Sequence, residues 1–140
     1  MTTMTKAEIL TAINTNLTAY MATVEGNKPR VRGMGIYRAD ENGIIIQTWT
    51  IKDIHKQILK NPDIELCFNS KDGKQIRVSG KVEVIDDLAL KQEVVAKRPF
   101  MKKTVDEKGW GVVAMYALKH GKACIWTMQT NFEPKTYVEL

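Results

Sequence analysis

The sequence predicts a mainly β protein, a small antiparallel β-barrel with flanking helices. Two observations predict this class: six or seven short segments have the composition or alternation of strands, and tight turns rich in Gly, Asn and Asp separate most of them. A chain of 140 residues suits one domain, so we expect residues 1–140 to form a single unit. A hydrophobic share of 44% with 26% charged residues excludes wholesale disorder.

The first third of the chain predicts a helix followed by three strands. Thr5 and Glu8 have the spacing of a capping box, so a short helix is expected to begin there. Strands are expected over residues 17–24, 30–38 and 44–49, with turns at 25–29 and 40–43 between them. The first two of these strands form a hairpin in this prediction.

A second helix is expected over residues 51–60. We expect Thr50 to cap its N-terminus and Pro62 to follow its end. Its buried stripe is predicted to consist of Ile51, Ile54 and Ile58.

Two strands are predicted next, over residues 63–69 and 75–85. The second alternates regularly, with its inward positions at Ile76, Val78, Val82 and Val84. Gly80 lies in the middle of this strand, where a bend or a close approach of two backbones is expected.

The last part of the chain predicts one more helix and a final hairpin. The helix is expected over residues 88–97, capped by Asp86-Asp87 and ended by Pro99. Residues 100–111 are expected to be a loop. Residues 112–118 and 122–128 are expected to pair as a hairpin across Lys119-His120-Gly121.

Charge and cysteine usage limit the classes of partner. The net charge is +5, and residues 30–60 and 88–108 each hold six basic and three acidic residues. This excess invites an anion, but a barrel that binds single-stranded nucleic acid would need Lys and Arg interleaved with aromatics on several strands. Only residues 30–38 show that pattern, so no nucleic-acid partner is expected. Without a long apolar run or a secretory N-terminus, and with Cys67 and Cys124 far apart, we expect a cytoplasmic protein with no membrane partner.

An arginine pair is the first candidate binding feature. Arg30 and Arg32 are two residues apart on a predicted strand and face the same side, while Gly33 and Gly35 leave room on the other side. Two guanidinium groups on one face repel unless an anion lies between them, and arginine binds phosphate through two hydrogen bonds. A solvated face with ordinary charges explains the same pattern.

The second candidate feature is the entry to the second helix. Thr48, Trp49 and Thr50 lead into this helix, whose first turn carries Lys52, with Lys56 one turn later on the same face. The free amides at a helix N-terminus attract anions, and Thr50 either caps the helix or donates to a phosphate. A capped helix with solvated lysines is the alternative to a phosphate that both basic pairs share.

Residues that would catalyse a reaction by themselves are not recognisable. The sequence contains no phosphate-binding loop, dinucleotide fingerprint or nucleophile elbow, and His55 and His120 have no partners with metal-ligand spacing. No metal site is therefore expected. Trp49, Trp110 and Trp126 are candidates to stack on a ring or to pack in a core or interface. Any chemistry would belong to a bound cofactor.

Four stretches together carry a resemblance to a known family: YMATVEGNKPRVRGM (20–34), QTWTIKDIHKQILKNPDIELCF (47–68), QIRVSGKVEVIDD (75–87) and MYALKHGKACIW (115–126). In this order they resemble the pyridoxamine 5′-phosphate oxidase-like family of FMN-binding split barrels. The resemblance is closest to the small single-domain branch with nitroimidazole-resistance-type and general-stress-type proteins. It implies a six-stranded antiparallel split barrel and a homodimer with one FMN in each of two clefts between the subunits.

The resemblance also implies roles for the candidate residues. The strand with Arg30 and Arg32 would lie along the flavin, with Arg32 near the ring or the phosphate. Thr48 would belong to the cofactor site, and Trp49 and Thr50 would approach the ring edge through backbone atoms. The phosphate would be held by Thr50, Lys52 and Lys56. The partner subunit's Trp110 or Trp126 would cover the ring.

The function implied is an FMN-dependent oxidoreductase that passes electrons from NAD(P)H to a small acceptor of nitroaromatic or quinone type. The alternative is a non-catalytic sensor or storage module for flavin or another ligand, and some relatives bind the deazaflavin F420 or haem. Residues 50–56 read TIKDIHK where the oxidase itself has a Ser-Arg-Lys run, and the C-terminal Arg/His substrate motif of that enzyme is missing. Oxidation of pyridoxamine phosphate is therefore not expected.

Overall fold

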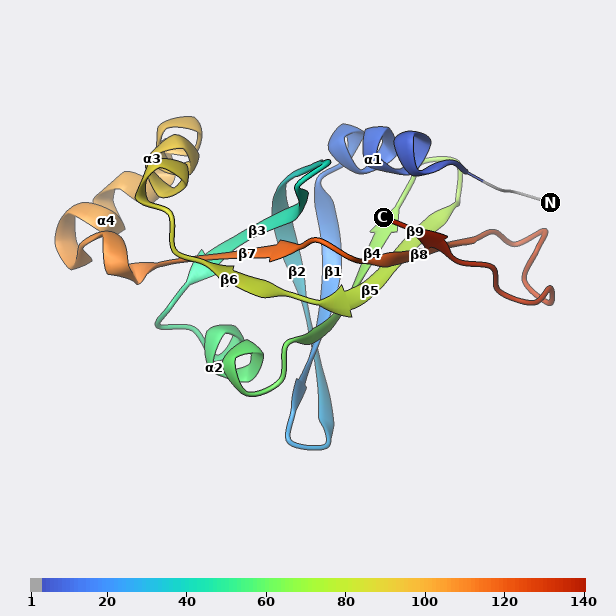
Figure 1. Ribbon diagram of the computed structural model, residues 1–140, viewed down its shortest axis with the longest axis horizontal. Helices are drawn as coiled ribbons and strands as arrows, with labels where there is room; N and C mark the ends of the chain where they lie inside the picture. The colour runs from blue at the N-terminus through green and yellow to red at the C-terminus, as the bar shows by residue number, and fades with distance from the viewer. Residues whose placement is uncertain (1–3) are drawn as a thin grey trace.

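A strongly curled antiparallel sheet forms the body of the protein in the computed structural model, which describes residues 4–140 (Figure 1). The strands are β1 (Thr18–Glu25), β2 (Lys28–Asp40), β3 (Gly43–Trp49), β4 (Asp63–Asn69), β5 (Gln75–Lys81), β6 (Glu83–Ile85), β7 (Val113–Leu118), β8 (Lys122–Trp126) and β9 (Val138–Glu139). The helices are α1 (Lys6–Thr15), α2 (Asp53–Lys60), α3 (Leu88–Lys97) and α4 (Lys102–Lys108), with 3₁₀ turns η1 (Pro99–Met101) and η2 (Trp110–Val112).

Two long strands of the sheet are each interrupted once, between β5 and β6 and between β7 and β8. The strand order is β6-β7-β3-β2-β1-β4-β5-β8-β9, and β6 directly follows β5 in the chain. The pair β6–β7 lies at one end of this order, and the pair β5–β8 lies near the other end. Because β5 leads directly into β6 and β7 into β8, the chain connects these two ends of the sheet. The predicted mainly β, barrel-like class with flanking helices is confirmed, although the two interruptions and the short β9 raise the strand count from six to nine within residues 4–140.

The predicted hairpin between residues 112–118 and 122–128 is wrong. β7 pairs with β3 and β6, and β8 pairs with β5 and β9, so β7 and β8 continue in one direction and do not fold back on each other. Gly80, at the end of β5, lies beside the connection between β7 and β8. A Cβ atom on Gly80 would lie 2.7 Å from Leu118 Cδ1 and 3.4 Å from Gly121 Cα, so a side chain there would have to displace the end of Leu118. The strand predicted over residues 75–85 ends at Lys81 and resumes at Glu83, and Val84 faces outward, exposed, where an inward position was expected.

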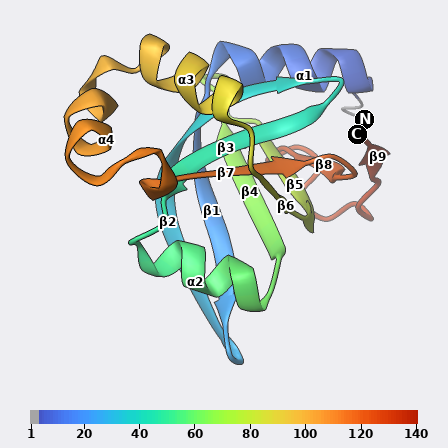
Figure 2. The ribbon, with the colours of Figure 1, turned by 60° about the vertical axis from the view of Figure 1, so that its left-hand side comes forward.

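The inside of the curl holds the main core. Helix α1 covers one end of it with Ile9 and Ile13, both fully buried, and begins with the predicted capping box of Thr5 and Glu8. Helix α2 covers the opposite end, as Figure 2 shows, and contributes Ile54 and Ile58. The other members come from the inward faces of the strands, among them Met21, Ile36, Ile46, Leu66, Val78 and Tyr116.

A second core lies outside the sheet. Helices α3 and α4 and the turn η1 pack on the outer side of β3 and β7, where Val94, Met101 and Val105 are buried against Ile45 and Met115. Residues 100–111 were expected to be a loop, and this expectation is wrong because burial of these apolar side chains stabilises short helical turns there. The prediction for α3 is confirmed, with Asp87 accepting a hydrogen bond from the Leu90 amide.

The start of α2 differs from the prediction. The helix begins at Asp53, with Lys52 at the N-cap position, and Ile51 is 63% exposed instead of joining the buried stripe. Thr50 does not cap the helix. Its hydroxyl lies 3.3 Å from Gly111 O and 3.4 Å from Val112 O, and its amide donates to Val112 O at 2.8 Å. The Thr50 amide and hydroxyl are therefore bonded to the segment before β7, and the hydroxyl does not cap α2.

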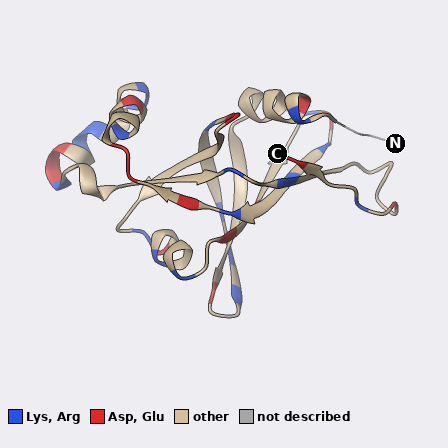
Figure 3. Cartoon of the chain, in the orientation of Figure 1, with Lys and Arg blue, Asp and Glu red and all other residues tan. Residues whose placement is uncertain are grey.

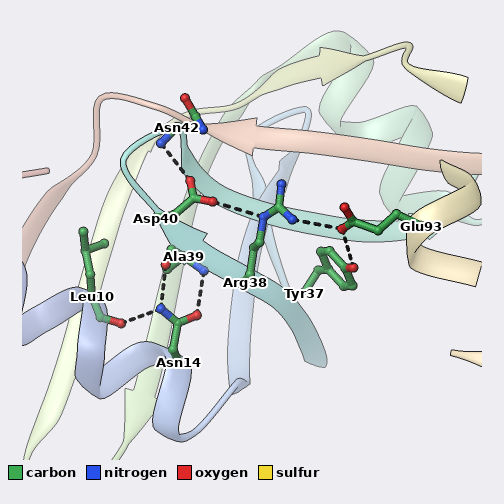
Figure 4. Close-up of polar contacts among 8 residues, drawn as sticks. All are labelled: Leu10, Asn14, Tyr37, Arg38, Ala39, Asp40, Asn42 and Glu93. Carbon is green, nitrogen blue, oxygen red and sulfur yellow. Dashed lines mark hydrogen bonds and ion pairs between the residues drawn. The ribbon is translucent and has the colours of Figure 1, made fainter. Parts of the chain in front are cut away.

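Polar contacts fasten the far end of β2 to two helices (Figure 4). The Asn14 side chain accepts from Ala39 N and donates to Ala39 O, which ties α1 to the strand. On the other side, Glu93 of α3 accepts hydrogen bonds from Tyr37 and Arg38 at 2.6 and 2.9 Å. Burial, with the nearby Glu93 carboxylate, raises the pKa of Tyr37 to about 12, so Tyr37 stays a donor at neutral pH. These contacts hold α3 in a fixed position over the sheet.

In the view of Figure 3, basic and acidic residues are intermixed on α3 and α4 and occur on both helices and strands.

No helix within residues 4–140 has the length and apolar character needed to cross a membrane.

Candidate functional site

A groove of about 390 Å³ lies where β2 and β3 meet the segment that links α3 to η1. We call it the β2–β3 groove. Its lining residues are Gly33, Met34, Gly35, Gln47, Thr48, Trp49, Lys52, Arg98 and Phe100. Because β2 and β3 are antiparallel neighbours, the groove follows β3 from Gln47 toward Lys52, with β2 beside it.

The floor of the groove is open because Gly33 and Gly35 have no side chains. A Cβ atom on Gly33 would meet only Tyr20 Cε1 at 4.0 Å, and one on Gly35 would meet only Arg98 Nη2 at 4.0 Å. Neither glycine has a positive φ, so no turn requires it. The two glycines instead leave a flat strip of backbone that larger side chains would fill, which is the shape that a planar ring needs.

Arg98 forms one wall of the groove. The register of β2 against β3 shifts between Ile36 and Arg38, so Tyr37 is an extra residue in β2. Arg98 Nη2 donates to the carbonyl of Ile36 at this bulge at 3.0 Å, and Nη1 lies 3.5 Å from Gln47 Oε1. The guanidinium carbon is 5.3 Å from the centre of the Tyr37 ring. Within residues 4–140 no carboxylate forms an ion pair with Arg98.

Lys52 marks the other end of the groove. It occupies the N-cap position of α2, where the His55 amide donates to Lys52 O at 3.1 Å and no described group accepts from the Asp53 and Ile54 amides. These amides and the Lys52 ammonium group together form a positively polarised end, which suits a phosphate. Trp49 lies between the two ends and is partly buried against the outer core.

Arg30 and Arg32 do not line the groove. Arg32 lies on the inward face of β2 and donates to Thr23 Oγ1 at 2.8 Å, to Gln57 Oε1 at 2.8 Å and to Met21 O at 3.2 Å. Burial lowers the pKa of its guanidinium group. Arg30 forms an exposed ion pair with Glu25 at 2.8 Å, and Gln57 Nε2 donates to the other Glu25 oxygen at 3.3 Å. No external anion is needed between the two arginines. Glu25 pairs with Arg30, and neutral acceptors bind the Arg32 guanidinium group.

The remaining predicted residues are distributed over other surfaces. Thr50 lines a different groove of about 320 Å³ together with His55, Lys91 and Val84. Lys56 is exposed on α2 and lines neither groove, so it does not act as a pair with Lys52. Trp110 lines an apolar groove of about 400 Å³ between α3 and α4. Trp126 lines a further pocket near the C-terminus. Of the nine predicted residues, the structure brings Thr48, Trp49 and Lys52 together in the β2–β3 groove.

Sequence reasoning missed Gln47, Arg98 and Phe100, which come from a buried strand position and from the end of α3. The glycine pair did give a signal, since its lack of side chains was visible in the sequence. For Arg98 no local signal exists, because its position depends on the bulge at Tyr37, about 60 residues earlier in the chain.

A histidine–tyrosine pair lies near the α2 end of the curl, outside the β2–β3 groove. His55 Nδ1 is 2.5 Å from the hydroxyl of Tyr116, which is fully buried. Burial raises the pKa of Tyr116 and lowers the pKa of His55. At neutral pH both side chains are therefore uncharged and share one hydrogen bond. Among residues 4–140 no group of three or more His, Cys, Asp and Glu side chains is arranged to hold a metal ion.

Comparison with known proteins identifies the family. Residues 5–126 match the family model of pyridoxamine 5′-phosphate oxidase, which is most of the chain. The chain belongs to this family. Among curated proteins, none matches the sequence.

Solved structures of several proteins are similar to this chain. A NimC/NimA family protein from Clostridium acetobutylicum is 28% identical, with a TM-score of 0.72 over 89% of this chain and 85% of that chain. A protein related to general stress protein 26, also from C. acetobutylicum, is 14% identical, with a TM-score of 0.69 over 96% of this chain and 93% of that one. PhzG from Burkholderia lata, solved with tetrahydrophenazine-1-carboxylic acid, is 9% identical, with a TM-score of 0.63 over 96% and 89% of the two chains. The last two likenesses concern the fold alone.

Proposed function

We propose that this member of the pyridoxamine 5′-phosphate oxidase family binds FMN in the β2–β3 groove and transfers electrons from NAD(P)H to a small acceptor of nitroaromatic or quinone type. The observation that carries the proposal is the groove itself, which combines a glycine floor with a cationic residue at each end. The shape suits a planar ring, and the Lys52 end suits a phosphate. When bound, FMN would supply the redox chemistry, because the chain has no recognisable nucleophile or acid–base motif of its own.

Different residues of the groove would bind different parts of FMN. Gly33 and Gly35 allow a ring to lie against the backbone, and Trp49 offers apolar contact beside it. Lys52 and the uncapped amides of α2 would hold the phosphate, in agreement with the sequence prediction for Lys52. The loss of Thr50 as a cap supports this role, because the Asp53 and Ile54 amides of the first turn are left for a ligand.

The lining residues favour a flavin over haem. Haem iron takes an axial His, Cys, Met or Tyr ligand. Of these four residue types, only methionine, as Met34, is among the described residues that line the groove. The deazaflavin F420 shares the planar ring and the phosphate, so it is tested beside FMN.

The direct test is an absorption spectrum of the purified protein, recorded before and after addition of FMN and passage through a desalting column. We expect the flavin bands to stay with the protein. Loss of all flavin to the column contradicts the proposal. Retention of F420 in a parallel sample, without FMN, would change the cofactor and keep the site.

A second candidate function, a non-catalytic flavin sensor or store, is supported by one observation. The described residues that line the groove include no Asp, Glu, His or Cys, so none of them is suited to donate or accept a proton near neutral pH. Anaerobic mixing of the FMN-loaded protein with NADPH or NADH separates the two functions. Bleaching of the flavin, followed by its recovery on addition of a quinone, supports the oxidoreductase. A flavin that stays oxidised supports the sensor.

We also propose that two copies of the chain associate over the outer face of β1 and β2. Tyr20 and Val31 are 57% and 69% exposed on this face, which is unusual for large apolar residues on neighbouring strands. Tyr20 borders Gly33, so a second copy bound at this face would also form one side of the β2–β3 groove. Sedimentation equilibrium should give twice the chain mass of 15.9 kDa, and Val31→Lys should give monomers that bind FMN more weakly. A wild-type monomer contradicts this part of the proposal.

A further inference from the structure

Arg98 differs from the other arginines that the structure places near β2 in how its charge is used. Arg30 and Arg38 form ion pairs with carboxylates, and Arg32 is held by three internal acceptors. Arg98 contacts only neutral acceptors, the Ile36 carbonyl and the Gln47 amide oxygen, although a guanidinium group has five N–H donors. Its positive charge is therefore not neutralised by any described carboxylate, and it lines the groove.

The position of Arg98 is set by several independent contacts. The bulge at Tyr37 turns the Ile36 carbonyl toward Nη2, and the Tyr37 ring lies beside the guanidinium plane. Gln47 is oriented by its own contact, since Nε2 donates to Thr48 O at 2.8 Å and leaves Oε1 for Arg98. A cation held in this way needs little reorganisation when negative charge develops beside it.

The two cations of the groove lie at different ends. Arg98 contacts Gln47, and Lys52 lies five residues further along the chain, beyond Trp49. Only the Lys52 end has the uncapped helix amides that suit a phosphate, whereas the Arg98 end adjoins Gly35 and the exposed aromatic ring of Phe100. A phosphate at Lys52 thus leaves the glycine floor and Arg98 for the ring.

We propose that Arg98 faces the ring of the bound flavin and selectively stabilises its reduced, anionic form. This inference rests on the proposed function. Reduced FMN with one added proton holds two more electrons than oxidised FMN, so its ring carries one additional negative charge. A fixed cation at the ring end attracts that charge more strongly than it attracts the neutral oxidised ring. Arg98 is in this sense a residue that tunes the reduction potential, and Lys52 is one that holds the ligand in both redox states.

The test compares Arg98→Gln with Lys97→Gln. Both variants lose one positive charge at the end of α3, but Lys97 does not line the groove, although its ammonium group lies 5.9 Å from the same Tyr37 ring. The affinity for oxidised FMN is measured by quenching of flavin fluorescence. The midpoint potential of bound and free FMN then gives the affinity for the reduced form through a thermodynamic cycle. Circular dichroism of each variant confirms folding.

We expect Arg98→Gln to lower the ratio of reduced to oxidised affinity on the order of tenfold, which is about 30 mV for a two-electron couple. Arg98→Lys keeps the charge and should keep most of the ratio, so it serves as the second variant if the glutamine variant folds poorly. Lys97→Gln should leave the ratio unchanged.

Three results would overturn the assignment. An unchanged ratio in Arg98→Gln, with weaker binding of both redox forms, would mean that Arg98 holds the phosphate instead of the ring. If Arg98→Gln and Lys97→Gln lower the ratio of reduced to oxidised affinity equally, the effect comes from the total charge at the end of α3 and not from the position of Arg98. If the wild-type protein binds no FMN, the proposed function fails together with this inference, whereas FMN binding with an unchanged ratio removes the Arg98 assignment alone.

Discussion

The two faces of β2 use arginine in opposite ways. On the inward face, Arg32 donates to Thr23, Gln57 and Met21 O, which joins β1 to α2. On the outward face, β2 has glycine at positions 33 and 35, and Arg98 of the α3–η1 segment lies beside that open strip without an acidic partner. The number of basic residues on a strand therefore does not locate an anion site. What matters is which basic residue keeps donors and charge that the chain itself does not use.

Removal of Arg32 should have the largest effect on stability. Arg32→Met would leave Thr23 and Gln57, both buried, without a charged donor. We expect a loss of about 2–3 kcal/mol in the free energy of unfolding, measured by urea denaturation. Arg30→Met, which breaks only an exposed ion pair, is the control and should cost much less. Equal losses in the two variants would mean that Arg32 does not fasten β1 to α2.

A valine at position 35 should test the outward face with little effect on folding. Gly35 has no positive φ, its Cβ would meet nothing closer than 4.0 Å, and valine suits a strand. We expect Gly35→Val to weaken FMN binding at least about tenfold, or 1.4 kcal/mol, because the side chain would occupy the groove. Gly111→Val, at a glycine whose Cβ also meets nothing within 4 Å but which lies outside the groove, is the matched control. Unaltered binding by Gly35→Val would place the ligand elsewhere.

Lys52 should show a smaller effect that depends on the phosphate. The wild-type protein is expected to prefer FMN over riboflavin, which lacks the phosphate. Lys52→Gln should reduce this preference by about threefold to tenfold, since one exposed charge is lost. Lys56→Gln, one helical turn away and outside the groove, should leave the preference intact. If Lys56→Gln has the larger effect, the phosphate lies on the side of α2 away from the groove.

The smallest expected effect is a pH dependence that originates at the α2 end of the curl. Burial lowers the pKa of His55 below its usual 6.5, so the unfolded chain binds a proton at a higher pH than the folded chain. The stability that neutral His55 provides is complete above about pH 6.5 and is lost as the pH falls through the lower folded pKa. We expect His55→Gln to have a flatter stability profile between about pH 7 and pH 5 than the wild type. His120→Gln, at an exposed position, serves as the control, and identical profiles for all three proteins would refute the effect.

Local sequence signals predicted those elements that local contacts stabilise. The capping residues Thr5 and Asp87 gave the starts of α1 and α3, and β4 has the bounds that the sequence indicated. The predictions failed where a distant segment decides the structure. Lys119-His120-Gly121 resembles a hairpin turn, but Gly121 instead allows β8 to pass close to Val78 and Gly80. A glycine that permits a turn and a glycine that permits close packing look the same in a sequence.

The candidate site was predictable only where its residues are neighbours in the chain. Thr48, Trp49 and Lys52 lie next to one another in the chain, and a strand that leads into a helix places them together. Arg30 and Arg32 have the spacing of an anion site, but the acceptors that satisfy Arg32 come from β1 and α2. Arg98 reaches the groove only because β2 bulges at Tyr37 and α3 packs on the outer core. None of these long-range contacts is encoded by spacing within one segment.

The difference between the two faces of β2 is tested most directly by titration of FMN against Gly35→Val and Arg32→Met, followed by flavin fluorescence under conditions where both variants are folded. If the outward face binds the flavin, Gly35→Val loses binding while Arg32→Met keeps an affinity close to that of the wild type. The reverse result, with binding lost in Arg32→Met and kept in Gly35→Val, would contradict the assignment of the β2–β3 groove and restore the arginine pair as the cofactor site.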